Sequence, residues 1–171
     1  MATPIIRPGR IEDLPALTAI YNHYVTESTA TFDLNPFSVE ERQPWFDQFN
    51  TGVHPLLVAT MDDVVVGYAY AGRFRAKPAY DQTVESTVYL APDSQRRGVG
   101  SALYEALFAH LDTQPVHRVI AVITLPNEAS RALHARFGFR EIGTLTHAGY
   151  KFGRYCDTLW LERSGRYEED A

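Results

Sequence analysis

Apolar positions recur along the chain with two spacings, and these spacings predict a sheet flanked by helices. Short runs of β-branched and aromatic residues bounded by Gly, Pro, Asn or Asp predict strands, whereas apolar residues three and four positions apart predict helices. The strands are expected at residues 4–7, 56–60, 64–70, 83–90, 119–124, 139–145 and 157–162. The helices are expected from about residue 12, after the capping-box sequence Ser38-Val-Glu-Glu41, and at residues 98–111 and 127–137.

Two connections decide the fold class. The segment Met61-Asp-Asp63 joins two predicted strands as a hairpin, which requires antiparallel pairing. Strand 83–90, helix 98–111 and strand 119–124 form a crossover, which favours parallel neighbours. The sequence therefore predicts an α/β (α+β) protein with one mixed sheet.

Length and charge narrow the classes of protein. The 171 residues have the length of one ordinary domain, expected over residues 1–165, with a solvated acidic tail at residues 166–171. A hydrophobic fraction of 45% argues against intrinsic disorder. A net charge of −5 argues against a general nucleic-acid coat, although a local basic patch could still bind an anion.

The expected compartment is the cytoplasm. No apolar run approaches the roughly 18 residues of a membrane span, and residues 1–10 contain no signal-peptide core. The single cysteine, Cys156, excludes an internal disulfide and a multi-cysteine zinc site. We expect no membrane partner, no nucleic-acid partner and no metal.

The strongest chemical signal is the glycine-containing turn Gln95-Arg-Arg-Gly-Val-Gly100, which leads into a predicted helix. Its glycines allow a tight turn, and the amides of a helix start suit a phosphate or pyrophosphate. An ordinary turn with two solvated arginines is the alternative. A Walker loop fits poorly because it ends in Gly-Lys-Ser/Thr, whereas Gly100 is followed directly by Ser101. A dinucleotide fingerprint fits poorly because its third glycine would fall at position 103, which is Leu103.

This turn resembles the Q/R-x-x-G-x-G/A signature of the GNAT superfamily of N-acetyltransferases, in which the turn cradles the pyrophosphate of acetyl-CoA. Further blocks resemble the phosphinothricin acetyltransferase branch of that superfamily, and the matches span about residues 5–163. These blocks are Asn22-His-Tyr24, Ser28-Thr29, Phe32, Ala79-Tyr-Asp81, Thr83-Val-Glu-Ser-Thr-Val-Tyr89, Leu125-Pro-Asn127, Leu133-His134, Ala148-Gly-Tyr-Lys151 and Trp160.

The resemblance implies a mostly antiparallel GNAT sheet and acetylation of the α-amino group of a small amino-acid-like substrate. Phosphinothricin, methionine sulfone and methionine sulfoximine are the substrates of the branch. It also implies acetyl-CoA as co-substrate, a homodimer, and an oxyanion donor among the backbone amides of residues 88–90. The residues expected to bind acetyl-CoA are Val88, Tyr89, Leu90, Gln95, Arg96, Arg97, Gly98, Val99, Gly100, Ser101, Asn127 and Ser130.

Acyl transfer to an amine needs a general base, because an ammonium group has no lone pair with which to attack a thioester. Glu85 is the candidate for this base. Strand alternation puts Glu85, Thr87 and Tyr89 on one face. Burial there would raise the pKa of the carboxyl toward the working pH. Spacing alone favours a solvent-facing charge, whereas the resemblance implies the catalytic glutamate of the branch at this position.

His134 is the second candidate for the chemistry. Asn127, Ser130 and His134 are spaced i, i+3 and i+7, which places them on one helical face. Many GNAT enzymes carry at this position a tyrosine that is proposed to protonate the departing thiolate, and the branch has His. Imidazole could donate that proton or hydrogen-bond the sulfur. A half-buried packing histidine is the alternative, and Asn127 doubles as a helix N-cap.

The candidate substrate contacts lie on both sides of Glu85. Arg73, Arg75 and Lys77 alternate along an extended segment and could receive a substrate carboxylate, although singly each is typical of a solvated surface charge. The resemblance to the amino-acid site of the branch favours Arg75 and Lys77 among these cations, together with Phe32. The residues expected to bind substrate are Phe32, Arg75, Lys77, Tyr80, Glu85 and Tyr89.

Three alternatives remain open from the sequence. Cys156 could be an acyl-enzyme nucleophile, but no base is indicated beside it, so direct transfer in a ternary complex is the simpler expectation. The same fold could act on protein N-termini or lysines. A non-catalytic acyl-CoA-binding module is the third alternative.

Overall fold

A computed structural model describes residues 3–165, which form seven strands, four α-helices and three 3₁₀ turns. The strands are β1 (Ile5–Pro8), β2 (Leu56–Met61), β3 (Val64–Arg73), β4 (Thr83–Leu90), β5 (Arg118–Thr124), β6 (Arg140–Lys151) and β7 (Arg154–Ser164). The helices are α1 (Leu14–Glu27), α2 (Val39–Phe46), α3 (Val99–Leu111) and α4 (Glu128–Arg136). The 3₁₀ turns are Ile11–Asp13, Pro78–Tyr80 and Pro92–Ser94. The predicted acidic tail, residues 166–171, lies outside the described residues.

The strands form one sheet in the order β1-β2-β3-β4-β5-β7-β6. Neighbouring strands pair antiparallel except β4 and β5, which pair parallel as the crossover predicts. The hairpin between β2 and β3 turns at Asp62 and Asp63, which have φ of 49° and 62°. Asp tolerates this left-handed conformation better than most side chains do. The predicted class, a mixed and mostly antiparallel sheet flanked by helices, is confirmed.

Two local details of the prediction were wrong. The first helix begins at Leu14 rather than near residue 12, because Arg10 and Asp13 form a 3₁₀ turn in which the Asp13 carboxylate accepts from the Arg10 amide at 2.8 Å. The last two strands are longer than predicted and join through Phe152 and Gly153. The pairing register of β6 shifts between Leu145 and Gly149, where His147 has φ of 55°, so the regular strand pattern is interrupted at the point where the predicted strand ends.

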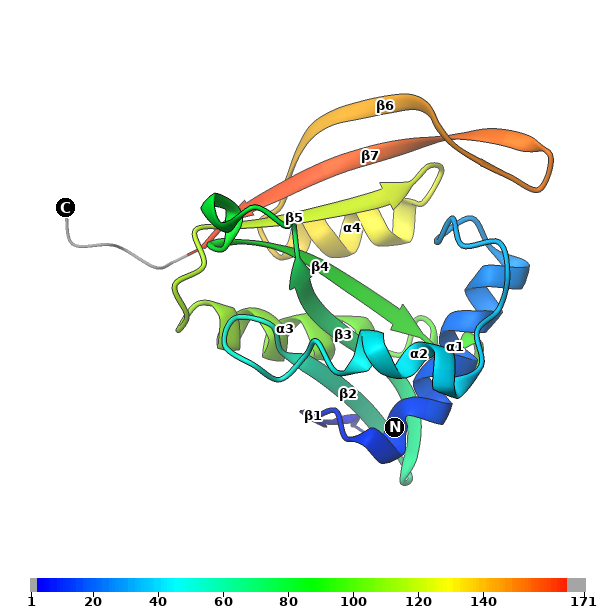
Figure 1. Ribbon diagram of the computed structural model, residues 1–171, viewed down its shortest axis with the longest axis vertical. Helices are drawn as coiled ribbons and strands as arrows, with labels where there is room; N and C mark the ends of the chain where they lie inside the picture. The colour runs from blue at the N-terminus through cyan, green and yellow to red at the C-terminus, as the bar shows by residue number, and fades with distance from the viewer. Residues whose placement is uncertain (1–2, 166–171) are drawn as a thin grey trace.

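The sheet divides at β4 and β5 (Figure 1). These strands pair only where Thr83–Glu85 faces Arg118–Ile120. Beyond that joint β4 continues along β3, whereas β5 continues along β7. A cleft can therefore open between the diverging strands, in the middle of a continuous sheet.

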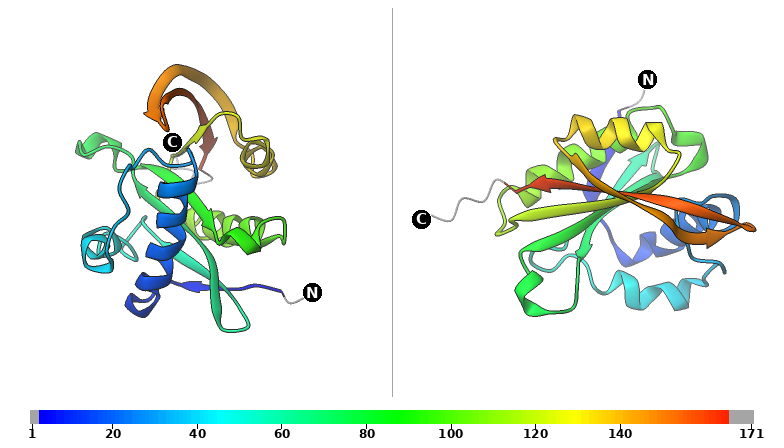
Figure 2. Two further views of the ribbon diagram at one scale, coloured as in Figure 1. Left: turned by 90° about the vertical axis from the view of Figure 1, so that its right-hand side faces the viewer. Right: turned by 90° about the horizontal axis from the view of Figure 1, so that it is seen from above.

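Helices cover both faces of the sheet. Helices α1 and α2 lie over one face, and α3 and α4 lie over the other (Figure 2). The larger core packs α3 against β2, β3 and β5 through fully buried side chains such as Leu103 and Leu107. Ser38 caps α2 by accepting from the Glu41 amide at 3.2 Å while the Glu41 carboxylate accepts from the Ser38 amide at 2.8 Å, which confirms the predicted capping box. No helix in residues 3–165 is long and apolar enough to cross a membrane.

Candidate active site

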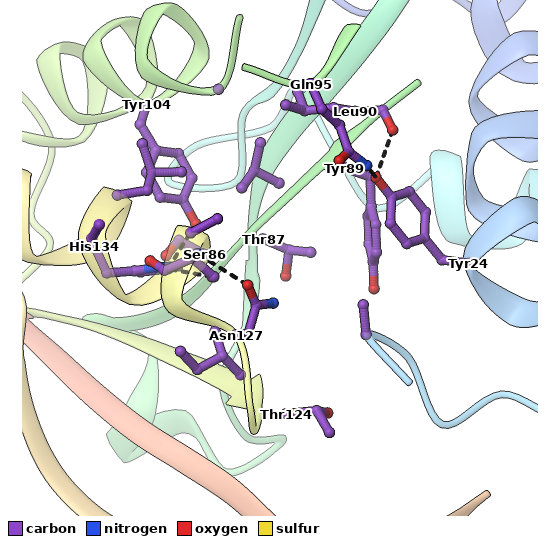
Figure 3. A pocket seen from close by; sticks show the side chains of 18 of the residues that line it. Tyr24, Ser86, Thr87, Tyr89, Leu90, Gln95, Tyr104, Thr124, Asn127 and His134 are labelled. Carbon is purple, nitrogen blue, oxygen red and sulfur yellow. Dashed lines mark hydrogen bonds between the residues drawn. The ribbon is translucent and has the colours of Figure 1, made fainter. Parts of the chain in front are cut away.

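The cleft between the diverging strands has a volume of about 720 Å³. It is walled by β4, the start of α3, the end of β5, α4 and the segment that follows α1 (Figure 3). Most of the predicted site residues line it together. They are Phe32, Glu85, Val88, Tyr89, Leu90, Gln95, Arg96, Gly98, Val99, Gly100, Ser101, Asn127, Ser130 and His134.

The α3 N-terminus forms one end of the cleft. Gly98, the N-cap, has φ of +79° and offers no side-chain acceptor. Among the described residues, the amides of Val99, Gly100 and Ser101 have no hydrogen-bond acceptor. They line the cleft at the positive end of a 13-residue helix, and Arg96 adds a cation beside them. This end of the cleft is suited to a phosphate or pyrophosphate.

Tyr24 of α1 fixes the end of β4 next to this helix start. Its hydroxyl donates to the Leu90 carbonyl at 2.7 Å and accepts from the Gln95 side-chain amide at 3.5 Å (Figure 3). Its ring also packs against Tyr89, with ring centroids 5.1 Å apart. Tyr24 therefore sets the position at which β4 leaves the sheet and the glycine turn begins.

Glu85 lies half-buried on β4 and lines the cleft. Burial raises the pKa of its carboxyl above the ordinary value. Among residues 3–165 the carboxylate has neither an ion pair nor a hydrogen bond that would counter this effect. A carboxylate of this kind can accept a proton from a bound substrate, because no residue of the described chain competes for its oxygens.

His134 lies almost fully buried in the α4 wall, and both of its ring nitrogens are engaged. Nδ1 lies 2.7 Å from the Ser130 carbonyl and donates to it, since a carbonyl can only accept. Nε2 lies 3.1 Å from the Tyr104 hydroxyl, which donates to it in that tautomer. Burial lowers the pKa of His134, so the ring is neutral at pH 7. The neutral imidazole thus holds the phenol of Tyr104, which also lines the cleft.

Asn127 starts the α4 wall, where its side-chain oxygen accepts from the Ser130 amide at 3.1 Å. This is the N-cap predicted from the sequence. The cap occupies the oxygen of Asn127 and leaves its side-chain amide nitrogen able to donate into the cleft that the residue lines.

One part of the cleft wall, which we call the aromatic end, is lined by rings. Phe32, Tyr70 and Tyr89 line it around Glu85 and Thr87. Burial raises the pKa of Tyr89 well above its ordinary value, so its phenol stays protonated and neutral. This end can enclose a small, partly apolar group next to the Glu85 carboxylate.

Four predicted residues do not line the cleft: Arg97, Arg75, Lys77 and Tyr80. Arg75 and Lys77 are exposed in the segment that leads to β4. The guanidinium carbon of Arg75 lies 5.1 Å from the ring centre of Phe74, and the Tyr80 ring packs against the same Phe74 at 5.6 Å. The segment thus forms a small exposed cluster of its own.

Sequence reasoning missed Tyr104, which donates to His134. A signal for it exists, since Tyr104 follows Gly100 by four positions and so lies on the same face of α3 as the glycine that lines the cleft. In residues 3–165 no group of three or more His, Cys, Asp or Glu side chains is arranged to hold a metal ion.

The divided sheet, the helix start with unpaired amides and the partnerless glutamate form a site suited to acyl transfer from a phosphate-bearing donor. The acetyltransferase (GNAT) domain model matches residues 6–160, so the chain belongs to the GNAT acetyltransferase family and is an N-acetyltransferase. The predicted family is thereby confirmed.

Within that family, the chain is similar to two curated relatives and one solved structure, among others. The phosphinothricin N-acetyltransferase of Streptomyces coelicolor is 52% identical over 161 residues, 92% of this chain and 94% of the relative. The L-methionine sulfoximine/L-methionine sulfone acetyltransferase of Pseudomonas paraeruginosa is 37% identical and covers 92% of each chain. The Sinorhizobium meliloti phosphinothricin acetyltransferase in complex with AcCoA is 34% identical, with a TM-score of 0.91 over 95% of this chain and 89% of that one.

Proposed function

We propose that the protein transfers the acetyl group of acetyl-CoA directly to the α-amino group of a small amino-acid-like compound of the phosphinothricin, methionine sulfoximine or methionine sulfone type. The observation that carries the proposal is that the unpaired carboxylate of Glu85 shares one cleft with the unpaired amides of Gly100 and its neighbours. The named substrates of the relatives support the substrate class.

The acetyl-CoA end of the site is the α3 N-terminus. The amides of residues 98–101 and the cation of Arg96 would hold the pyrophosphate, and Arg97 would add charge from the exposed side of the turn. Asn127 and Ser130 line the opposite wall and would contact the extended arm of the cofactor. The bound acetyl-CoA supplies a thioester, whose carbonyl would be polarised by a backbone amide of residues 88–90.

Glu85 makes the amine a nucleophile. The substrate ammonium gives one proton to the carboxylate, and its nitrogen forms the bond to the thioester carbon. The carbon–sulfur bond then breaks, and the departing thiolate takes up the second proton that the nitrogen loses, so that the products are the N-acetyl amide and free thiol. The raised pKa of Glu85 makes it a better base than a solvated carboxylate. No acyl-enzyme is required. Cys156 is buried on β7 and is not part of the cleft lining, which supports direct transfer in a ternary complex.

His134 is proposed to assist the departure of the thiolate through Tyr104, whose hydroxyl could turn its hydrogen from Nε2 toward the sulfur and donate a hydrogen bond as negative charge develops there. This assignment is supported by the contact of Nε2 with the Tyr104 hydroxyl. The substrate end comprises Phe32, Tyr89 and Glu85. Arg75, Lys77 and Tyr80 remain predicted contacts of the substrate's anionic groups.

The protein is further proposed to work as a homodimer in the cytoplasm. The β6–β7 hairpin exposes a set of apolar side chains that a partner copy would cover. With their exposed fractions, they are Ile142 (44%), Leu145 (52%), Tyr150 (58%), Phe152 (56%) and Tyr155 (64%).

A thiol-release assay tests the function. Purified protein and acetyl-CoA are mixed with amino acids, methionine sulfone, methionine sulfoximine, phosphinothricin and a panel of peptides. We expect thiol release and an N-acetylated product with members of the analogue group. Activity on peptides alone would replace this substrate class by protein termini or lysines. Binding of acetyl-CoA without thiol release for any amine would leave a non-catalytic module.

A further inference from the structure

The segment that follows α1 forms part of the aromatic end of the cleft. Ala30, Thr31 and Phe32 line it, although no helix or strand contains them. On the α1 side, the Tyr21 hydroxyl contacts the Thr31 hydroxyl at 2.8 Å and donates to the Asp33 carboxylate. A segment without regular structure can keep a defined shape only if other elements hold it.

Lys151, the last residue of β6, holds this segment from the far end of the chain. Its ammonium donates to the carbonyls of Ser28 at 2.7 Å, Thr31 at 2.8 Å and Tyr24 at 3.3 Å. An ammonium has three N–H donors, so all three are used. The residue is 2% exposed, and burial lowers the pKa of its ammonium. A buried ammonium is costly unless its donors are satisfied, and here one carbonyl in the last turn of α1 and two in the segment after it satisfy them.

Gly149, two residues earlier on β6, makes a second contact with the same segment. Alternation along the strand puts Gly149 and Lys151 on one face, while Tyr150 between them is exposed. A Cβ placed on Gly149 would lie 2.2–2.4 Å from the outer ring atoms of Phe32. The Phe32 ring therefore rests directly on the backbone of β6, in space that a larger residue would fill.

We propose that Lys151 is a positioning residue of the acetyl-acceptor site, and that Gly149 is its partner. Lys151 ties the Ser28–Thr31 carbonyls together so that Phe32 stays seated over Gly149 and keeps its place in the cleft wall. The inference rests on the proposed function, because it assigns this aromatic end to the amine substrate. Neither residue lines the cleft, so both act through Phe32 and its neighbours.

The variant K151M tests this role, because Met keeps most of the side-chain length and removes all three donors. We expect KM for the preferred amine to rise about 10- to 100-fold, since small misplacement of a substrate-positioning group has effects of this size. The dissociation constant for acetyl-CoA should change by less than about twofold, because the α3 N-terminus is untouched. Amide hydrogen exchange in residues 28–33 should become faster.

Two more variants make the result specific. R154M removes an exposed cation from the same hairpin end and should leave KM and hydrogen exchange at wild-type values. G149A displaces the Phe32 ring without touching a charge and should raise the amine KM as K151M does. Unchanged amine KM in both K151M and G149A would overturn the proposal. An equal loss of amine and acetyl-CoA binding in K151M would also overturn it, because that pattern indicates general destabilisation.

The exchange measurement separates this inference from the proposed function. If the wild-type protein releases no thiol with any amine, the proposed function fails, and exchange in residues 28–33 of K151M still decides whether Lys151 holds the segment. If the wild-type protein is active and K151M shows neither faster exchange nor a higher amine KM, only the positioning role fails.

Discussion

At the scale of single residues, the site depends on two groups whose pKa values burial moves in opposite directions. Burial raises the pKa of Glu85 and lowers that of His134, and in both cases the neutral form is favoured. For Glu85 the consequence is a stronger base. For His134 it is an uncharged ring that can hold Tyr104 through Nε2.

Replacing Glu85 by Gln should lower turnover by roughly 10²–10⁴-fold, because the amide cannot accept the substrate proton. Acetyl-CoA binding should remain near the wild-type value. In the wild-type protein, kcat/KM should fall as pH decreases through the raised pKa of Glu85, because the protonated carboxyl is no base. Steady-state rates across pH and calorimetry with acetyl-CoA measure both effects.

The variant E105Q is the matched control, since Glu105 is an exposed carboxylate on α3 outside the cleft lining. It should keep the wild-type rate and pH profile. Undiminished turnover in E85Q would remove Glu85 from the mechanism.

Glu85 should also cost stability. Its pKa is higher in the folded than in the unfolded protein, so the ionised carboxylate opposes folding. The penalty is absent below the unfolded pKa of about 4.3 and grows as pH rises toward the folded value. E85Q should therefore raise Tm at neutral pH and leave it nearly unchanged at about pH 4. A lower Tm for E85Q at neutral pH would contradict burial of an unpaired charge.

His134 and Tyr104 should behave as a unit. We expect H134A to lower turnover, but less than E85Q does, because the amine can still lose its proton to Glu85. Y104F should have a similar effect if the imidazole acts through the phenol. The double variant should then be no slower than either single variant. Full activity of H134A at every pH tested would reduce the pair to a packing role.

At the scale of elements, the start of α3 combines a structural and a binding demand. A Cβ on Gly100 would lie 3.6 Å from side-chain atoms of Leu133 and Leu90, which is ordinary contact. Gly98 is different, because its φ of +79° strains other residues even though the space around it is open. Gly98 is therefore required by the backbone conformation, whereas Gly100 is expected to matter for the approach of the ligand to the helix-start amides.

The variant G100A separates binding from folding. Ala favours a helix over Gly by about 1 kcal/mol, so Tm should stay the same or rise. Affinity for acetyl-CoA should fall, because the methyl group narrows the approach to the helix-start amides. Thermal unfolding and calorimetry check the two outcomes. Wild-type acetyl-CoA affinity in G100A would argue against pyrophosphate contact at this turn.

At the scale of the whole molecule, the pattern of strands and helices could be predicted because it depends on local spacing. The β-branched run of β5 and the capping box at Ser38 are local signals of this kind. The contact of Tyr104 with His134 joins two helices, and the contact of Lys151 with Ser28 joins positions far apart in the chain. No short stretch of sequence contains either pair. The block Ala148-Gly-Tyr-Lys151 could therefore be recognised from the sequence, but the contacts of Lys151 could not be predicted from it. The cytoplasmic location stays a prediction.

The proposed dimer is tested at this scale. Y155E introduces a charge into the exposed apolar set of the β6–β7 hairpin, where the Tyr155 ring packs against Tyr150 at 4.9 Å and His147 at 5.4 Å. We expect light scattering to report a dimer for the wild-type protein and a shift toward monomer for Y155E. The control V64E alters a residue that is 63% exposed at the start of β3 and should remain dimeric. A monomeric wild-type protein at working concentration would refute the proposal.

The bonds of Lys151 also constrain the order in which the protein can be completed during synthesis. Its three acceptor carbonyls lie 120 to 127 positions earlier in the chain. The α3 N-terminus, by contrast, is built from one continuous stretch that leaves the ribosome well before Lys151 does. A nascent chain that ends before β6 therefore contains the residues of the helix start but not Gly149, the residue against which the Phe32 ring packs. Gly149 and Lys151 are thus made late, although the segment that they hold in place, Ala30 to Phe32, is made early.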